Sequence, residues 1–334
     1  MGVKGLLKFL SINSDIIGDG SIRRIGFHEL RNKTIVVDAS IYMYRFKQEG
    51  DLAEMMYHFL SLMRYYNVKL IFVFDGKPPD NKLDTIQSRR DARSAAKSDH
   101  SVQTKQLVDL MEQYHHEQNS PDPDSLRIKE YKKRIDRLEF KIESSRRNAV
   151  TIRYTDFELV KSMLDMMGVY HTTPEQEADS LCARFVTSGI AYACLTEDTD
   201  LFVYGCDRII RGLDIFSKSV MLYPTKQIYK SIGLSMQEFQ MICFLSGTDY
   251  FDATIDGGIT SAYKLYRQSK SCLFPKIVDD ILRETGTNTQ TLLDNYSCTH
   301  CASDIASYNR NCHSVRYDDR LTRVTMRQHG FIYV

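Results

Sequence analysis

Residues 34–40, with the letters TIVVDAS, decide the fold of this chain. A short run of β-branched and apolar residues leads directly into an aspartate. Residues 70–75 (LIFVFD) and residues 191–198 (AYACLTED) repeat the arrangement, since each apolar run also ends in acidic side chains. Runs of this length and composition are typical of buried strands in a parallel sheet. The three stretches therefore predict neighbouring strands that carry carboxylates at their carboxyl ends.

Amphipathic stretches lie between these runs and predict helices. They cover residues 52–66, 157–167 and 178–188. Strands that alternate with helices favour an α/β fold, with a mostly parallel twisted sheet flanked by helices. Ligands of such sheets bind beyond the carboxyl ends of the strands, which is where the acidic side chains are expected.

A polar, helix-prone region interrupts the α/β pattern at residues 80–150. Within it, residues 127–153 hold ten lysines and arginines against four acidic residues. We interpret the region as a basic helical insertion that projects from the sheet. A solvated charged helix with no binding role is the alternative that composition leaves open.

The chain is accordingly divided into four parts. The expected parts are an N-terminal α/β region at 1–79, the helical insertion at 80–150, an internal region at 151–268 and a C-terminal extension at 269–334. The extension has weak periodicity and carries little information.

Composition limits the possible partners and compartments. The 334 residues include 44 lysines and arginines and 43 acidic residues, a net charge of +1, so any nucleic-acid site must depend on local charge patches. Eight cysteines lie mostly in apolar runs. With no signal peptide at the start, this distribution predicts reduced thiols inside the cell. No run approaches the roughly 18 apolar residues that a membrane span needs.

A set of acidic residues follows the predicted strands or lies near predicted helix starts. Each alone has a structural explanation as a turn residue, a helix cap or a loop residue. Converging on one sheet edge, however, they would repel one another unless cations neutralised them. The set consists of Asp38, Asp75, Glu175, Glu177, Asp198, Asp200 and Asp249.

The chemistry of this set predicts its metal. Oxygen ligands without histidine or cysteine suit Mg²⁺, for which Mn²⁺ can substitute, and not Zn²⁺. Two such ions about 4 Å apart can support cleavage of a phosphodiester. Asp198 and Asp200 are two residues apart and would share a face of an extended chain. Glu175 and Glu177 would diverge on a regular helix, so this pair needs an irregular first turn or an outer role for one member.

At these residues the sequence resembles the flap endonuclease and XPG-type superfamily of structure-specific 5′ nucleases. The resemblance runs in order from residue 1 to about residue 268, and it implies a PIN-like nuclease fold in which all seven carboxylates bind two metal ions. The matching blocks are residues 1–6 (MGVKGL), 37–40 (VDAS), 73–79 (VFDGKPP), 175–179 (EQEAD), 196–200 (TEDTD) and 247–250 (GTDY).

The resemblance also implies residues that handle the substrate. Lys82 and Arg89 lie seven residues apart, which places them on one face of a helix, and their implied role is to stabilise charge at the scissile phosphate. Tyr44 matches an aromatic residue that stacks on a base beside the cleavage site. Gly2 would place an α-amine near the metals once Met1 is removed. Surface cations and a core tyrosine are the alternatives for the first three.

Adjacent glycines follow the last carboxylate at Gly257 and Gly258. Glycines before a helix expose backbone amides that can bind a phosphate, and the resemblance places a helix-turn-helix-type duplex-binding element here. The family usually has two glycines separated by an apolar residue. This chain departs from that pattern, which affects the K⁺ site that the family carries. An ordinary helix-turn-helix corner is the alternative.

A second metal site is a further alternative in the C-terminal extension. Cys298 and Cys301 have the spacing of zinc ligands, and Cys312 and His313 follow as an adjacent pair. Free thiols are the favoured interpretation, because the adjacent pair is awkward for tetrahedral closure.

These observations predict a Mg²⁺-dependent 5′-flap endonuclease or 5′–3′ exonuclease that acts on branched or 5′-ended DNA. The alternatives are a Holliday-junction or bubble nuclease, a 5′ exoribonuclease, or an inactive protein that binds branched DNA. The tail lacks a motif for binding a sliding clamp, and a monomer is expected. The compact length is similar to versions carried by large DNA viruses. The expected location is the nucleus for a cellular protein, or the host nucleus or cytoplasm for a viral one.

Overall fold

A mixed sheet forms the centre of the molecule. The computed structural model describes residues 2–13, 17–18, 21–77, 83–269, 273–298, 301–312 and 317–328. Within these residues the sheet has seven strands in the order β1-β7-β6-β5-β2-β3-β4. The strands are β1 (Arg23–Gly26), β2 (Thr34–Asp38), β3 (Lys69–Val73), β4 (Tyr170–Thr172), β5 (Ala193–Leu195), β6 (Arg208–Asp214) and β7 (Ser219–Pro224).

The register of the central strands aligns their carboxyl ends. β6, β5, β2, β3 and β4 run parallel to one another. At one edge, β7 pairs antiparallel with β6, and β1 pairs antiparallel with β7. Val37 of β2 lies between Phe72 of β3 and Leu195 of β5. The residues that follow these strands therefore emerge at one edge of the sheet. The prediction of a mostly parallel α/β fold is confirmed, and the antiparallel hairpin of β6 and β7 was not predicted.

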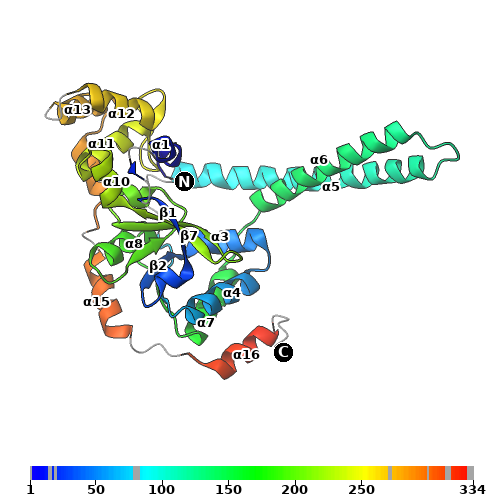
Figure 1. Ribbon diagram of the computed structural model, residues 1–334, viewed down its shortest axis with the longest axis horizontal. Helices are drawn as coiled ribbons and strands as arrows, with labels where there is room; N and C mark the ends of the chain where they lie inside the picture. The colour runs from blue at the N-terminus through cyan, green and yellow to red at the C-terminus, as the bar shows by residue number, and fades with distance from the viewer. Residues whose placement is uncertain are drawn as a thin grey trace.

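Helices cover both faces of the sheet (Figure 1). One face packs against α3, α4, α7, α16 and the short η1, and the other packs against α1 and α8 to α14. The helices on the first face are η1 (Phe27–Leu30), α3 (Ala39–Glu49), α4 (Leu52–Tyr65), α7 (Tyr154–Met166) and α16 (Asp319–Gln328). Those on the second are α1 (Leu6–Ile12), α8 (Ala178–Thr187), α9 (Asp200–Val203), α10 (Thr225–Ser231), α11 (Met236–Ser246), α12 (Gly258–Gln268), α13 (Phe274–Glu284) and α14 (Thr289–Asn295).

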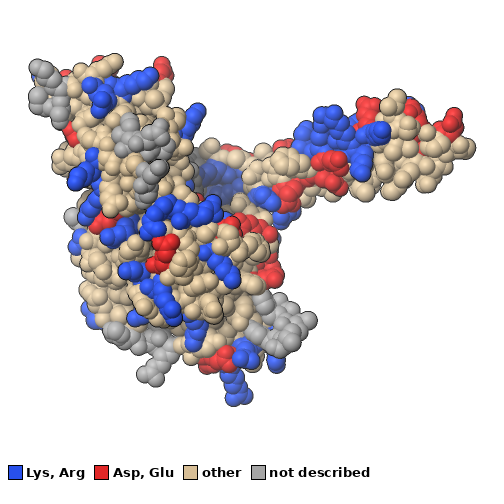
Figure 2. Space-filling view, viewed as in Figure 1, with Lys and Arg blue, Asp and Glu red and all other residues tan. Residues whose placement is uncertain are grey.

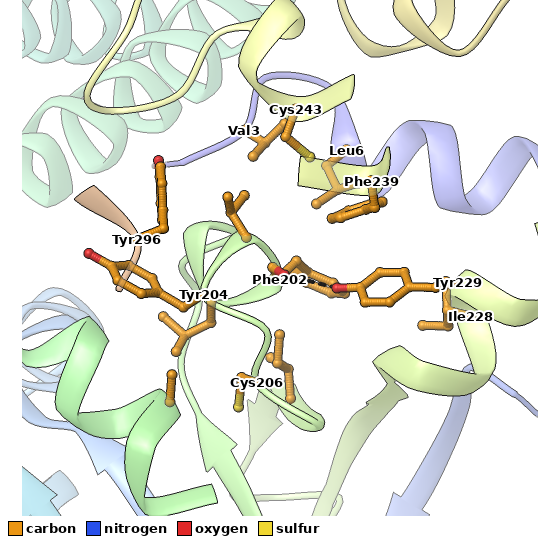
Figure 3. Packing of buried hydrophobic residues seen from close by; sticks show 14 of the residues in the cluster. Val3, Leu6, Phe202, Tyr204, Cys206, Ile228, Tyr229, Phe239, Cys243 and Tyr296 are labelled. Carbon is orange, nitrogen blue, oxygen red and sulfur yellow. Dashed lines mark hydrogen bonds between the residues drawn. The ribbon is translucent and has the colours of Figure 1, made fainter. Parts of the chain in front are cut away.

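Aromatic side chains fill both cores. On the first face, Tyr42, Phe46 and Phe59 are fully buried and pack ring against ring beside β3. Figure 3 shows part of the second core, where Phe202 and Tyr229 pack below α11 and are joined by a hydrogen bond. Burial of this kind contributes about 1.5–3 kcal/mol for each large side chain.

Two long helices project from the body as a hairpin (Figure 1). We call this hairpin, formed by α5 (Leu83–Gln118) and α6 (Ser125–Asn148), the arch. Asp124 caps α6 by accepting hydrogen bonds from the amides of Leu126 and Arg127. The Ser145 hydroxyl donates across the arch to Gln103 Oε1 at 2.9 Å. Apolar contacts between the helices are sparse, so much of the arch surface remains available to solvent or to a ligand.

The C-terminal extension wraps around the body. Tyr317 forms an antiparallel bridge with Met167, and Met326 of α16 is buried against the first face. The helix α15 (Ala302–Asn311) packs near α8, where the Cys301 thiol donates to the Ser180 hydroxyl. No helix in the described ranges has the length and apolar character required to cross a bilayer.

Candidate active site

Thr196 holds two of the predicted carboxylates together at the end of the sheet. Its hydroxyl donates to Asp38 Oδ2 at 2.9 Å and accepts the amide of Asp198 at 3.0 Å. Asp38 ends β2 and precedes α3, whereas Asp198 follows β5. All three residues are buried. A hydroxyl that can donate and accept at once therefore fixes the spacing between two strand ends.

Asp75 joins this pair from the next strand. Its Oδ1 accepts the amide of Ala178, the first residue of α8, at 3.2 Å. Gly76 packs directly against the backbone of residues 174–176, leaving no room for a side chain. Its amide donates to the carbonyl of Gln176, and the Lys77 amide donates to that of Glu175. The end of β3 is thereby held against the segment that carries Glu175 and Glu177.

The charge around Asp38 is crowded. Burial, together with the negative charges of Asp75 and Asp198, raises the pKa of the Asp38 carboxyl well above its usual range, and the hydrogen bond from Thr196 only partly opposes this. A cation beside these oxygens would favour the ionised form. The electrostatics of the strand ends therefore fit a site for a positive ion.

Asp198 and Asp200 are close for a different reason than predicted. The sequence predicted an extended chain, but Thr199 has helical dihedral angles and Asp200 begins α9. The two meet because the Asp200 amide donates to Asp198 Oδ1 at 3.0 Å. The helix start keeps Asp200 almost fully buried.

Glu175 and Glu177 lie in a non-helical segment before α8, with a bend at residues 175 and 176. α8 begins only at Ala178, and Glu177 is its extended N-cap residue. Tyr250 donates its hydroxyl to Glu177 Oε2 at 2.7 Å. Glu175 has an exposed side chain. Because both glutamates precede the helix, their side chains are not subject to the divergence expected for residues two apart on a regular helical turn.

The N-terminal segment reaches the last carboxylate, Asp249. The Gly2 amide donates to Asp249 Oδ1 at 3.0 Å. Gly2 has a φ of +78°, and a Cβ placed on it would overlap Asp198, Thr199 and Asp200. This close approach explains why a glycine is required beside the carboxylates.

The base of the arch contacts the site through two arginines on α5. Arg89 Nη2 forms an ion pair with Asp249 Oδ2 at 2.9 Å. Arg93, one turn further, donates to the Tyr44 hydroxyl at 2.9 Å, with its guanidinium 5.2 Å from the centre of the Tyr44 ring. Lys82 lies outside the described residues. Arg89 therefore contacts a carboxylate of the site, and Tyr44 contacts α5 one turn further along.

The two adjacent glycines lie at the start of α12, next to the N-terminal segment. Gly257 is the left-handed N-cap residue, with a φ of +86°, and Gly258 follows with a φ of +60°. A Cβ on Gly258 would lie 4.0 Å from the Lys4 carbonyl oxygen. The amides at this helix start are thus beside the segment that contacts Asp249.

The carboxylate oxygens of the site lie close to one another only in small groups. Within the described part of the chain, no three His, Cys, Asp or Glu side chains are positioned to hold a metal ion as they lie. The Asp249 carboxylate forms an ion pair with Arg89 and accepts a hydrogen bond from the Gly2 amide, and the Glu177 carboxylate accepts one from the Tyr250 hydroxyl. The same finding applies to Cys298, Cys301 and Cys312, and His313 lies outside the described residues. The donors at the sheet edge are carboxylate oxygens, which fit a hard cation, and Asp38, Asp75 and Asp198 are among the residues that would hold it.

Several residues around the site were not predicted to have a role. Thr196 lies within the quoted block at 196–200, but its bridging position requires the fold. Glu197 beside it accepts from the Tyr42 hydroxyl and the Gly212 amide and pairs with Arg45. Tyr296 donates to Asp200 Oδ2 at 3.2 Å from a tail that carried no recognisable pattern.

Positive charge gathers near the site and on the arch. Figure 2 shows lysine and arginine side chains along part of the arch and on the adjoining surface of the body. Between α5 and α6, a hollow of about 480 Å³ is lined by Arg134, Arg137 and Lys141 together with Asp109. The basic residues at 127–153 therefore lie on a projecting surface.

Two family models match this chain. The XPG N-terminal domain matches residues 1–96, and the XPG I-region matches residues 168–249. Together these ranges cover just over half of the 334 residues. They contain all seven carboxylates of the sheet edge.

Curated relatives extend the match along most of the chain. Flap endonuclease 1 of Cryptosporidium muris (strain RN66) is 26% identical over 321 residues, which span 87% of this chain and 59% of the relative. Flap endonuclease 1-A of Oryza sativa subsp. japonica is 28% identical over 290 residues, which span 81% of this chain and 67% of the relative. The chain thus spans less than two thirds of the length of the first relative.

Solved structures share the fold. The catalytic core of Rad2 in complex with DNA substrate has a TM-score of 0.57 at 18% identity, covering 89% of this chain and 86% of that one. Flap endonuclease-1 from Methanococcus jannaschii has a TM-score of 0.53 at 19% identity, covering 84% and 83%. Human GEN1 in complex with Holliday junction DNA has a TM-score of 0.57 at 18% identity, covering 99% and 74%. With the family models, this likeness shows that the chain belongs to the flap endonuclease and XPG superfamily of structure-specific nucleases.

Proposed function

We propose that this chain is a Mg²⁺-dependent 5′ nuclease that cleaves phosphodiesters of branched or 5′-ended DNA. The observation that carries the proposal is the convergence of Asp38, Asp75 and Asp198 at one sheet edge, where burial and the charges of Asp75 and Asp198 raise the pKa of Asp38. Membership of the superfamily supports the reaction class. If its substrate is DNA, the protein would act in the nucleus, or in the host nucleus or cytoplasm if its source is a virus.

The seven carboxylates would hold two Mg²⁺ ions, or Mn²⁺ in their place. Bound ions of this kind supply activation of a water and stabilisation of the leaving oxygen at a phosphodiester. Thr196 fixes Asp38 relative to Asp198, and the Asp200 amide fixes the Asp198 carboxylate. Because Asp249 is engaged by Arg89, metal binding and arginine release are expected to be linked.

The arch and its base would handle the substrate. Arg89 would exchange Asp249 for the scissile phosphate, with Lys82 as its expected partner. Its ion pair is partly exposed and therefore worth only about 0–1 kcal/mol, so a phosphate can compete for it. Tyr44 would exchange the Arg93 contact for a base, since stacking is worth about 1–3 kcal/mol.

The duplex side of the substrate would meet the start of α12. Amides at Gly257 and Gly258 lie at a helix N-terminus, which favours a phosphate. The basic arch would guide the 5′ single strand, and its charge supports sequence-independent contact with a phosphate backbone. We expect the protein to act as a monomer.

A double variant tests the site. Asp198→Asn with Asp200→Asn should bind a labelled 5′ flap with the affinity of the parent and cut it at least 1000-fold more slowly, a loss in the range of removed electrostatic catalysis. Asp122→Asn with Asp280→Asn is the matched control, because both side chains are exposed and the change in charge is the same. Parental cleavage by the first variant would refute the assigned site.

A panel of substrates tests the specificity. Labelled 5′-flap, nicked, bubble, four-way and RNA substrates are compared with and without Mg²⁺. The proposal predicts metal-dependent cutting with a preference for flap or 5′-ended DNA. A preference for four-way or bubble DNA would favour the junction or bubble nuclease, and a preference for RNA would favour the exoribonuclease.

A further inference from the structure

Tyr296 brings the C-terminal extension into direct contact with the site. It follows α14 and is 4% exposed. Its hydroxyl donates to Asp200 Oδ2 at 3.2 Å. This tyrosine lies outside both ranges that match the family models.

Aromatic packing holds the Tyr296 ring in one position. Its centre lies 4.8 Å from that of Tyr204 and 5.2 Å from that of Tyr250, both edge to face. The ring centre of Phe244, on α11, lies 5.8 Å from that of Tyr296. Figure 3 shows Tyr296 and Tyr204 side by side, arriving from different segments. A ring packed on several sides places its hydroxyl with little freedom.

The neighbouring tyrosines continue the hydrogen bonding to a second carboxylate. Tyr204 and Tyr250 hydroxyls are 2.9 Å apart, and Tyr250 donates to Glu177 Oε2 at 2.7 Å. We call Tyr204, Tyr250 and Tyr296 the tyrosine cluster. It connects Glu177, before α8, with Asp200, at the start of α9. The cluster is therefore built to hold two acidic side chains in fixed orientations.

We propose that Tyr296 is a positioning residue that orients the Asp200 carboxylate for metal binding, so that the C-terminal extension completes the active site. The inference rests on the proposed function for its link to cleavage. A donor on Oδ2 limits rotation of the Asp200 side chain and directs its remaining lone pairs. Partners that orient metal ligands in this way typically change metal affinity or activity by about 10–100-fold when they are removed.

The test compares two tyrosine-to-phenylalanine variants of the full chain. Tyr296→Phe keeps the packed ring and removes the hydroxyl from Asp200. Tyr229→Phe is the matched control, because its buried hydroxyl donates to the Phe202 carbonyl at 2.9 Å in the same core (Figure 3). Each variant loses one buried hydrogen bond, and only the first touches a proposed metal ligand.

Mn²⁺ binding, followed by electron paramagnetic resonance or calorimetry, is the primary measurement. We expect Tyr296→Phe to raise the Mn²⁺ dissociation constant about 10-fold, whereas Tyr229→Phe leaves it unchanged. On a 5′-flap substrate, Tyr296→Phe should lower kcat and leave KM for DNA near the parental value. Thermal unfolding without metal should shift by a similar amount in both variants.

The outcomes separate this inference from the proposed function. If Tyr296→Phe binds Mn²⁺ as tightly as the parent, or if the control weakens binding equally, the positioning role is refuted. If the parent binds no Mn²⁺, the inference also fails. If the parent binds Mn²⁺ but cuts no nucleic acid, and Tyr296→Phe weakens binding, the proposed function fails while the positioning role stands.

Discussion

Replacing Gly2 with alanine tests how closely the N-terminal segment approaches the carboxylates. Gly2 and Gly5 both have a φ of +78°, so an alanine at either position meets the same backbone strain of about 1–2 kcal/mol. Their surroundings differ. A Cβ on Gly5 would have only Ile259 nearby, at 3.9 Å, whereas one on Gly2 would overlap the Asp198 carboxylate.

The size of the required shift follows from the contacts. A Cβ on Gly2 would lie 2.7 Å from the Asp200 amide nitrogen, and ordinary contacts begin near 3.4 Å. The segment or the carboxylates must therefore move by about 0.7 Å. Since a misplacement of about 1 Å at a reacting centre can cost 100-fold in rate, we expect Gly2→Ala to lower kcat by about 100-fold. Gly5→Ala should stay within about two-fold of the parent.

Single-turnover cleavage of a labelled 5′ flap in Mg²⁺ provides the assay. Thermal unfolding of both variants checks that the shared strain lowers stability to a similar extent. Cleavage by Gly2→Ala at the rate of Gly5→Ala would show that the N-terminal segment can move away from the carboxylates without slowing the reaction. In that case cleavage would not require a glycine at position 2.

Three further predictions concern other parts of the chain. Thr196→Val should lower the free energy of unfolding by about 1–3 kcal/mol in denaturant titrations, because two buried partners lose their hydrogen bonds; an unchanged midpoint would contradict this. Partial burial favours a higher pKa for Asp156, but hydrogen bonds from Lys47 and a backbone amide lower it overall. The ionised Asp156 carboxylate therefore stabilises the fold at pH values above the usual aspartate pKa, and this contribution is lost as the pH falls through the lower pKa of the folded state. Asp156→Asn should lower the free energy of unfolding by about 1 kcal/mol at pH 7 and by progressively less in acid. A difference between variant and parent that does not change with pH would contradict this. Arg134→Ala on the arch should reduce the salt slope of single-strand binding by about 0.7, whereas exposed Arg310→Ala should leave it unchanged. The same slope in the parent and in Arg134→Ala would show that Arg134 contacts no phosphate.

The sequence revealed the parts of the fold that depend on local pattern. Apolar runs ending in Asp38 and Asp75 identify strands because a buried parallel strand needs an unbroken apolar stretch. β6 was missed, since Arg211 and Gly212 interrupt its apolar run. The polar helices of the arch were evident from composition, because residues 80–150 are helix-prone and turn residues interrupt them only at 119–123.

The contacts within the site could not be predicted from the sequence. Carboxylates can be assigned from their place after strands, but the pairing of Asp249 with Arg89 depends on how the arch base lies on the body. Tyr296 follows a short helix in a segment with no regular pattern, and its role depends on packing against residues far away in the chain. Such contacts become visible only when distant segments are placed together.

The bond between Gly2 and Asp249 joins residues 247 positions apart, and this separation has a consequence for biosynthesis. During synthesis Gly2 emerges from the ribosome early, and its acceptor exists only after residue 249 has been translated. Closing so large a loop is slow compared with forming local helices. A partly synthesised chain that lacks Asp249 should therefore leave the Gly2 segment without this anchor beside the carboxylates.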